Sequence, residues 1–390
     1  MAANWSMLEY RGREALERLE GDWRRLYAAM TLRTGFHAYE THVAYFDLLM
    51  AEPEKFRCLA LLDGQSVRAI CPLEARVDPA VGPSIPVWGV PLHPHIMVSD
   101  VICPEDDARR QLLPALLDYL RHRAEGRPLL VLGPLPADSV LWEGLQRLPP
   151  GISCTHAAMA ADVFDCEQSF DQLSSRFTTH FRSRLRRNSR RLSRLDDVRF
   201  VNATEDADLR SELEALLQVE ASGWKGESGT GSAIQLQPEL VAFYRTLTST
   251  LGSQGGEDRC EINSLYADGH CIASQFCMRT DGEYVMPKIA YDEEYSRLTP
   301  GLLLFEHTLE RCCNDEEIRQ LDFLTSPGWM NVWQPDPLAM QQAHLAIGRW
   351  SGRPLVAMLR FRFGRGREMV RWLRRRLKRD TEEGASVLSR

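Results

Sequence analysis

The chain has 390 residues, of which 44% are hydrophobic and 26% charged, and its formal net charge is -7. This is the composition of a soluble globular protein with room for two ordinary domains. The acidic balance argues against a general nucleic-acid binder, and no apolar run approaches the roughly 20 residues that span a bilayer. The first residues also lack the pattern of a secretory signal, so we expect a cytoplasmic protein that binds no nucleic acid.

Helices and strands alternate in the first part of the chain. Apolar residues recur at three- and four-residue spacing from Leu16 to Tyr27, as in an amphipathic helix. The pair Asp63-Gly64 separates two apolar runs and predicts a tight hairpin. The expected elements are, in chain order, a helix around 16–27, a hairpin at 56–77, a helix at 108–122 and a strand at 128–132.

The second part repeats this plan. Asp268-Gly269 and Asp281-Gly282 separate three strand-like runs and predict a three-stranded meander. A helix over 300–313 and a strand within 318–325 follow. The same order of hairpin, helix and strand on both sides of residue 165 indicates two copies of one α/β unit.

The ten cysteines are scattered, without a CxxC pair or metal-ligand spacing, which predicts reduced thiols. His93 and His95 lie two residues apart with Asp100 nearby, but no third ligand has a convincing spacing. We therefore expect no metal site, and histidines in such a Pro-rich loop are more often structural.

Residues 180–195, HFRSRLRRNSRRLSRL, contain seven arginines and no acidic residue. Phe177, Phe181, Leu185, Leu192 and Leu195 recur at helical spacing, which predicts an amphipathic helix docked on a domain. Its arginines form either a plain solvated face or one that meets an anion. A cofactor phosphate, a carrier protein or an anionic substrate fits that second interpretation better than DNA does.

Two loops are candidate ligand sites. In TPGLLLF, Thr299 is suited to the N-cap, Pro300 to the first helical position, and Gly301 leaves room for a ligand. Such a turn is either an anion site or an ordinary capped helix. The Gly-rich segment SGWKGESGTGS offers Trp224 and Lys225 as a platform and a cation on a lid, or else as parts of a solvated linker.

Two charged residues fall inside predicted strands. Alternation places Lys288 on the face of Tyr284 and Met286, where it either reaches solvent or meets an anion. Asp322 lies in a short apolar strand, where an unpaired carboxylate is costly. A structural ion pair and a catalytic role both remain open for Asp322.

The order of these motifs resembles the CelD/BcsL-type family of GNAT-fold acyltransferases, which is related to the FemAB-like aminoacyltransferases. The Arg-rich helix is followed by VRF, WKG, Phe243-Tyr244, PKIAYDEEY, TPGLLL and a strand with Asp322. The resemblance covers about residues 170–333, and the first part, with Asp22-Trp23 and its hairpin, is similar to the family's N-terminal half.

The resemblance implies an α/β protein of two tandem GNAT-like units with mixed sheets flanked by helices. Residues 1–165 would form the first unit, 166–350 the acyltransferase unit and 351–390 a basic tail. The donor would be acetyl-CoA, another acyl-CoA or an acyl-carrier protein, and the acceptor an amine, in polysaccharide or cell-envelope biosynthesis. The implied site comprises Lys225, Lys288 and Asp322 for catalysis, Thr299, Pro300, Gly301 and Leu302 for the donor, and Trp224, Tyr291 and Arg184 for the substrate.

Two features leave alternatives open. The family's last site strand usually leads from its Asp to a lysine, whereas this chain has LDFLTSPGWMNVW. FemAB-like transfer from aminoacyl-tRNA and a degenerate scaffold that binds a partner are therefore kept as alternatives. The basic tail, with VRWLRRRLKR, predicts weak peripheral contact with an anionic membrane or a solvated terminal helix.

Overall fold

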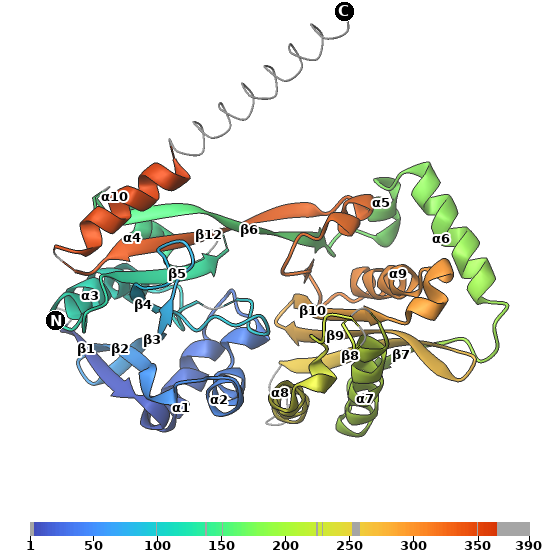
Figure 1. Ribbon diagram of the computed structural model, residues 1–390, viewed down its shortest axis with the longest axis horizontal. Coiled ribbons are helices and arrows are strands. Elements are labelled where there is room, and N and C mark those ends of the chain that lie inside the picture. The colour runs from blue at the N-terminus through green and yellow to red at the C-terminus, as the bar shows by residue number, and fades with distance from the viewer. Residues whose placement is uncertain are drawn as a thin grey trace, which may run out of the picture.

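The computed structural model describes residues 4–98, 100–136, 139–149, 151–223, 225–227, 229–251, 258–348 and 350–364. Two α/β units lie side by side in an elongated molecule (Figure 1). They share one 12-stranded sheet with the order β1-β2-β3-β4-β5-β12-β6-β11-β10-β9-β8-β7. The strands of the second unit thus continue the sheet in the reverse order of those of the first.

The two units repeat the same sequence of elements, as the paired hairpins predicted. The first comprises β1 (Trp5–Arg11), α1 (Gly12–Ala28), α2 (Tyr39–Leu48), β2 (Phe56–Asp63), β3 (Ser66–Val77), β4 (Pro86–Gly89), α3 (Ala108–His122) and β5 (Leu129–Leu135). The second comprises β7 (Arg199–Ala203), α7 (Asp206–Ser222), α8 (Pro238–Thr250), β8 (Arg259–Ala267), β9 (His270–Thr280), β10 (Glu283–Tyr291), α9 (Pro300–Cys313) and β11 (Gln320–Asp322).

Shorter elements connect or extend these units. They are the helices α4 (Trp142–Gln146), α5 (Phe170–Ser175), α6 (Thr179–Leu192) and α10 (Gly352–Phe363), and the 3₁₀ turns η1 (Gly35–His37), η2 (Pro53–Lys55), η3 (Ile234–Leu236), η4 (Glu293–Leu298) and η5 (Gly328–Trp333). Residues 352–363 of the predicted basic tail therefore form a helix, and Val356 and Leu359 of that helix are buried. Residues 365–390 lie outside the described ranges. Within those ranges, no helix is both long and apolar enough to cross a bilayer.

Two long strands join the units across the middle of the sheet. β6 (Ser153–Asp165) follows the first unit in the chain but pairs with β11 of the second unit. β12 (Asp336–Ala346) follows the second unit but pairs with β5 of the first. β6 and β12 also pair with each other along most of their length, and both run from one unit to the other in Figure 1. Each unit is thereby completed by a strand from the other half of the chain.

The Asp-Gly turns have the predicted positions but not one common geometry. Asp268-Gly269 and Asp281-Gly282 both have positive φ at each residue, as a two-residue primed turn requires. In the first hairpin Asp63 pairs with Ser66, so the two-residue loop is Gly64-Gln65 rather than Asp63-Gly64. Asp63 is thus the last residue of β2.

The arginine-rich segment forms the predicted amphipathic helix, α6. Its apolar residues Phe181, Leu185 and Leu192 are buried, and so is Asn188. The rings of Phe181 and Phe305 each lie 4.8 Å from that of Trp333, and the ring of Phe177 lies 5.3 Å from it. Aromatic packing of this kind fixes α6 on the second unit.

The ten cysteines are all free thiols, as predicted, and eight of them are buried. They belong to the cores on the two faces of the sheet rather than to a cross-linked framework. Burial raises the pKa of thiols such as Cys277, to about 12.

Candidate functional site

The second unit opens its sheet at the junction of β10 and β11. These parallel strands pair at only three positions, from Glu283 opposite Gln320 to Val285 opposite Asp322. β11 ends there, whereas β10 continues to Tyr291. The backbone beyond Asp322 turns away at Leu324, which has a φ of +60°, so the two strands separate beside the start of α9. The predicted strand at 318–325 is short for this reason.

α9 begins at a strained residue. Thr299 has a φ of +52°, an unfavourable conformation for a β-branched side chain, which costs of order 1–3 kcal/mol. The Oγ1 of Thr299 accepts a hydrogen bond of 3.0 Å from Nδ2 of Asn188 on α6. The strain is thus held in place by a buried side chain of another element. Strain of this type is concentrated at ligand-binding positions.

The first turn of α9 has one amide that faces no backbone partner. Pro300 has no N–H, and the amides of Leu302 and Leu303 both donate to the carbonyl of Thr299. Among the described residues, no partner is found for the Gly301 amide. A Cβ at Gly301 would lie 3.6 Å from the ring of Tyr291, an ordinary contact. The structure therefore brings four predicted residues together: Thr299, Pro300, Gly301 and Tyr291.

Lys288 was predicted to share a face of β10 with Tyr284 and Met286, but it lies on the opposite face. Val285 pairs with Met278 and Lys288 with Phe276, so a β-bulge at Met286-Pro287 shifts the alternation by one residue. Pro287 cannot donate a ladder hydrogen bond, and a bulge is where a strand accommodates it. Lys288 consequently shares the face of Val285 rather than that of Tyr284 and Met286.

Two lysines meet on this face, although the whole chain contains only four. Burial and the nearby ammonium of Lys225 lower the pKa of Lys288 to about 8, although the Glu220 carboxylate opposes both effects. Nζ of Lys225 lies 2.7 Å from Oε1 of Glu220. The other oxygen of Glu220, a buried residue, accepts from the Ile234 amide at 2.9 Å. Glu220 therefore fixes both Lys225 and the loop that carries it.

Gly226 makes this loop geometrically possible. A Cβ at this position would lie 2.1 Å from the carbonyl oxygen of Ala221, which no side chain can tolerate. The Gly-rich segment is therefore a folded loop on α7 at Lys225 and Gly226. Trp224, the other candidate in this segment, lies outside the described residues.

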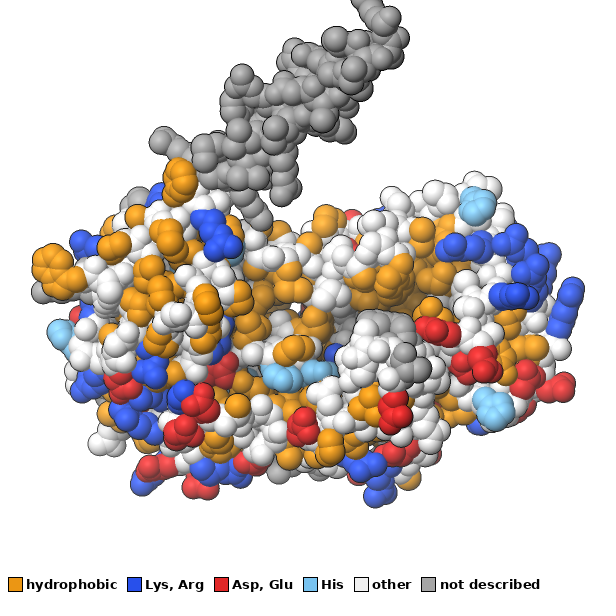
Figure 2. All heavy atoms as spheres, in the orientation of Figure 1, with side chains coloured by type: hydrophobic (Ala, Val, Ile, Leu, Met, Phe, Trp, Pro, Cys, Tyr) orange, Lys and Arg blue, Asp and Glu red, His pale blue; other side chains and the backbone are white. Residues whose placement is uncertain are grey.

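The first unit contributes two histidines to the same place. Nδ1 of His95 and the hydroxyl of Tyr244, on α8, are 2.9 Å apart in a hydrogen bond. The rings of His93 and His95 lie 5.4 Å apart. Burial, together with the positive charges of Lys288, His93 and Lys225, lowers the pKa of His95 to about 3. Figure 2 shows histidine side chains in the depression between the units.

Sequence reasoning considered these histidines only as metal ligands and set them aside as structural. They lie in the connection between β4 and α3, residues 90–107. The corresponding connection of the second unit, between β10 and α9, is shorter. No sequence pattern signals that the β4–α3 connection reaches Tyr244. Their proximity to the charge of Lys288 depends on how the two units pack, and no group of three metal-ligating side chains is found within the described ranges.

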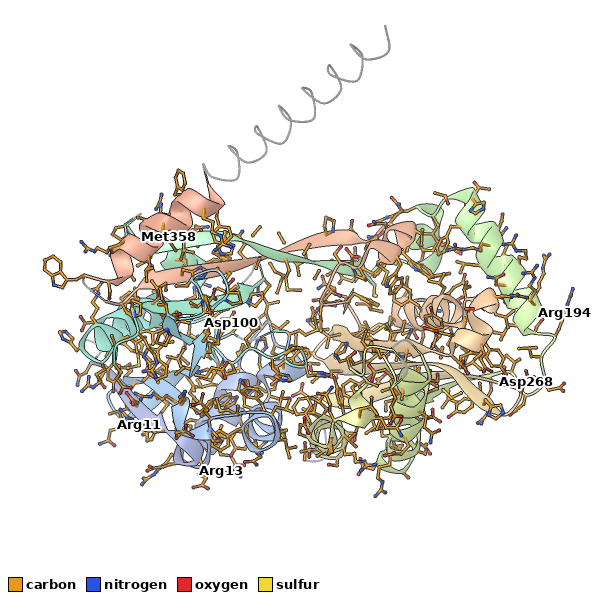
Figure 3. The ribbon with its side chains drawn as sticks, in the orientation of Figure 1. Arg11, Arg13, Asp100, Arg194, Asp268 and Met358 are labelled. Carbon is orange, nitrogen blue, oxygen red and sulfur yellow. The ribbon has the colours of Figure 1, made fainter. Side chains whose placement is uncertain are left out.

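Asp322 is separated from the two lysines. Its Oδ1 accepts a hydrogen bond of 2.6 Å from the Leu324 amide, which supports the turn after β11. It lines a pocket between the units with Arg33, Asp100 and Ser139, and neither Lys225 nor Lys288 lines that pocket. Figure 3 places Asp100 in the first unit, on its side toward the second unit. Asp322 is thus placed to shape the backbone where the strands part.

Arg184 lies on the side of α6 that faces the turn of α9. It precedes Asn188 by one helical turn, and its guanidinium carbon lies 5.1 Å from the centre of the Phe181 ring. Leu302 is half-buried in the adjoining first turn of α9. Both therefore adjoin the turn at Thr299 rather than the two lysines.

Comparison with known proteins identifies the second unit. Residues 179–329 match a family model described as an acetyltransferase (GNAT) domain. No curated protein matches the chain.

Three solved structures share the fold with TM-scores of 0.50. FemX is 11% identical over 78% of this chain and 90% of its own. L-PGS from Bacillus licheniformis is 12% identical over 87% and 96%. A conserved protein of unknown function from Bacteroides thetaiotaomicron is 12% identical over 84% and 97%. The chain therefore shares the fold of these structures over most of its length, and residues 179–329 of its second unit match the acetyltransferase (GNAT) domain model.

Proposed function

We propose that the second unit transfers an acyl group from a thioester donor to an amine. The observation that carries the proposal is the parting of β10 and β11 beside the strained turn of α9. Separated strands can admit a narrow, extended chain such as a pantetheine arm between them. The helix dipole and the Gly301 amide at the adjoining turn favour a phosphate group.

Lys288 is the residue best suited to remove a proton from the amine. With a pKa of about 8, roughly a tenth of its side chains are neutral at pH 7, and a base is most effective with a pKa near the working pH. His95, with a pKa of about 3, is a much weaker base and is better suited to orient the acceptor through hydrogen bonds. The positive charge of Lys225 lowers the pKa of Lys288, and the negative charge of Glu220 raises it.

The transfer would proceed by direct attack. The neutral amine nitrogen forms a bond to the thioester carbonyl carbon, the carbon–sulfur bond breaks, and the electron pair leaves on the thiolate. The proton lost by the acceptor nitrogen goes to Lys288 and can then return to the thiolate. The chain's own contribution is to orient the amine and hold this proton.

The finer assignments rest on the sequence resemblance. We infer a CelD/BcsL-type N-acyltransferase whose acceptor is an amine of polysaccharide or cell-envelope biosynthesis, and whose acyl group is not an aminoacyl group. Acyl-CoA and an acyl-carrier protein both supply the required thioester. A cytoplasmic location is proposed from the composition, and peripheral membrane contact from the basic sequence VRWLRRRLKR of the tail.

Calorimetric titration of acetyl-CoA and long-chain acyl-CoA tests the proposal. Gly301→Ala should bind nearly as well as the native chain, because its Cβ makes an ordinary contact with Tyr291. Gly301→Trp should lose binding at least about tenfold, which corresponds to ~1.4 kcal/mol. Gly21→Trp is the control, since Gly21 lies on α1 with open space around it. Unchanged affinity in Gly301→Trp would refute the assignment of the donor turn.

A further inference from the structure

The outer face of α6 carries a continuous row of arginines. Five of them line a shallow groove together with Ser183: Arg186, Arg187, Arg190, Arg191 and Arg194. We call these five residues the arginine row, and all five are exposed. Figure 2 shows the basic side chains along this edge of the second unit, and Figure 3 places Arg194 at its far end.

The arginine row is not neutralised by the protein itself. None of its five guanidinium groups has a hydrogen bond or an ion pair within the described ranges of the chain. On α1, by contrast, Arg18 and Arg24 each pair with a glutamate four residues earlier. α6 has no acidic residue at all between Thr179 and Leu192. Five neighbouring like charges repel one another, so the row is an electrostatic feature that an anionic partner would stabilise.

The same helix supports the proposed donor turn. Asn188, on the inner face of α6, donates the hydrogen bond that holds Thr299 in its strained conformation. α6 also packs against both α9 and η4, the elements on either side of that turn. A partner bound along the row would therefore lie one helix diameter, about 10–12 Å, from the start of α9.

Acidic residues border the row, which limits what can bind there. Asp196 and Asp197 follow α6 directly, and the Asp196 amide donates to Oδ1 of Asp268 at 3.0 Å. Figure 3 shows Asp268 near Arg194 at that end of the molecule. Glu306 lies along the inner side, where burial and Glu310 raise its pKa to about 7 and the Arg186 guanidinium opposes that rise. A narrow basic row with acidic borders suits a partner with a compact acidic face better than a broad membrane or a long RNA.

We propose that the arginine row is the docking surface for an acidic acyl-carrier protein, which presents its acyl-pantetheine arm to the turn of α9. This inference rests on the proposed acyl transfer and names the donor for it. Guanidinium groups form paired hydrogen bonds with carboxylates, so a row of arginines fits an acidic helix well. The row supplies recognition of the carrier, whereas the turn and the parted strands receive the arm.

The binding of a purified carrier protein to matched charge variants tests the proposal. The probe is the acyl-carrier protein of bacterial fatty-acid synthesis in its apo, holo and palmitoyl forms, followed by fluorescence anisotropy. Arg187→Glu/Arg190→Glu reverses two outward arginines and leaves Arg186 opposite Glu306. The control Arg121→Glu/Arg210→Glu makes the same change of charge on α3 and α7, at two exposed arginines.

The native chain and the control should bind the palmitoyl carrier alike. Arg187→Glu/Arg190→Glu should bind it at least about tenfold more weakly, and added salt should weaken native binding. The apo form should retain part of the affinity, since docking does not require the arm. Acyl-CoA binding should be the same in all three chains.

Several results would overturn the inference. Equal carrier affinity in the two double variants would refute docking on the row while leaving the proposed transfer intact, provided acyl-CoA still binds. Binding to phosphatidylglycerol vesicles that depends on the row, without carrier binding, would assign the row to a membrane. If the native chain binds neither acyl-CoA nor the carrier protein, the proposed function is refuted as well.

Discussion

Lys288 should titrate far below an ordinary lysine, and its neighbours should move its pKa in opposite directions. Burial and the Lys225 ammonium lower this pKa from 10.5 to about 8, against the opposing effect of Glu220. The difference corresponds to about 3 kcal/mol against the charged form. At pH 7 the neutral fraction rises from roughly 0.03% to roughly 10%, about 300-fold.

Substitution of each neighbour gives a signed prediction. Lys225→Met removes a positive charge, so the pKa of Lys288 should rise and its neutral fraction at pH 7 should fall. Glu220→Gln removes a negative charge, so the pKa of Lys288 should fall. Because Glu220 also accepts from the Ile234 amide, the glutamine should preserve the loop, and the melting temperature of the variant checks this.

Competitive acetylation with trace acetic anhydride between pH 6 and 11 measures these pKa values directly. The chain has only four lysines, so mass spectrometry separates their peptides readily. Lys55, a half-exposed residue paired with Glu52, provides the internal reference. Lys288 should gain reactivity near pH 8, well below the ~10.4 of a lysine in a model peptide. A Lys288 profile that coincides with that of Lys55, or one unmoved by both substitutions, would refute the electrostatic reasoning.

Three further changes test the packing, the loop and the tail. Trp333→Ala should lower the free energy of unfolding in urea by about 3–5 kcal/mol, because Trp333 is fully buried, whereas Trp350→Ala, at a 91% exposed side chain, should change it little. A cost below ~1 kcal/mol for Trp333→Ala would contradict the packing. Gly226→Val should displace Lys225 and raise the pKa of Lys288 in the acetylation assay, and an unchanged profile would show that the loop tolerates a Cβ. The full chain should float with phosphatidylglycerol liposomes at low salt and a chain ended at residue 364 should not; absence of flotation of the full chain would exclude membrane contact through the tail.

The sequence predicts most elements because their local signals agree with their packing. Apolar spacing predicts α1, α3, α6 and α9, and Asp-Gly pairs predict the three hairpin turns. The exchange of β6 and β12 between the units has no local signal, because pairing across the middle of the sheet depends on residues far apart in the chain. The shortness of β11 likewise follows from the turn at Leu324, whose positive φ has no sequence signal.

The candidate site was predicted in part. The predicted residues Thr299, Gly301 and Tyr291 lie close together, but simple alternation assigned Lys288 to the wrong face. Pro287 was the available signal for the bulge, since a proline within a central strand is rarely regular. No local signal could have placed His95 at this site, because its proximity to the charge of Lys288 arises only where the two units pack together.

Product formation from a ¹³C-labelled acyl thioester tests the central claim most directly. The native chain, supplied with labelled acyl-CoA or acyl-carrier protein and a panel of amino sugars, amino acids and polyamines, should form a labelled N-acyl product. The thiol should appear in equal amount, and Lys288→Met should lower the rate at least about tenfold. Thiol release that no amine accelerates, or a product formed equally fast by Gly301→Trp, would contradict the account.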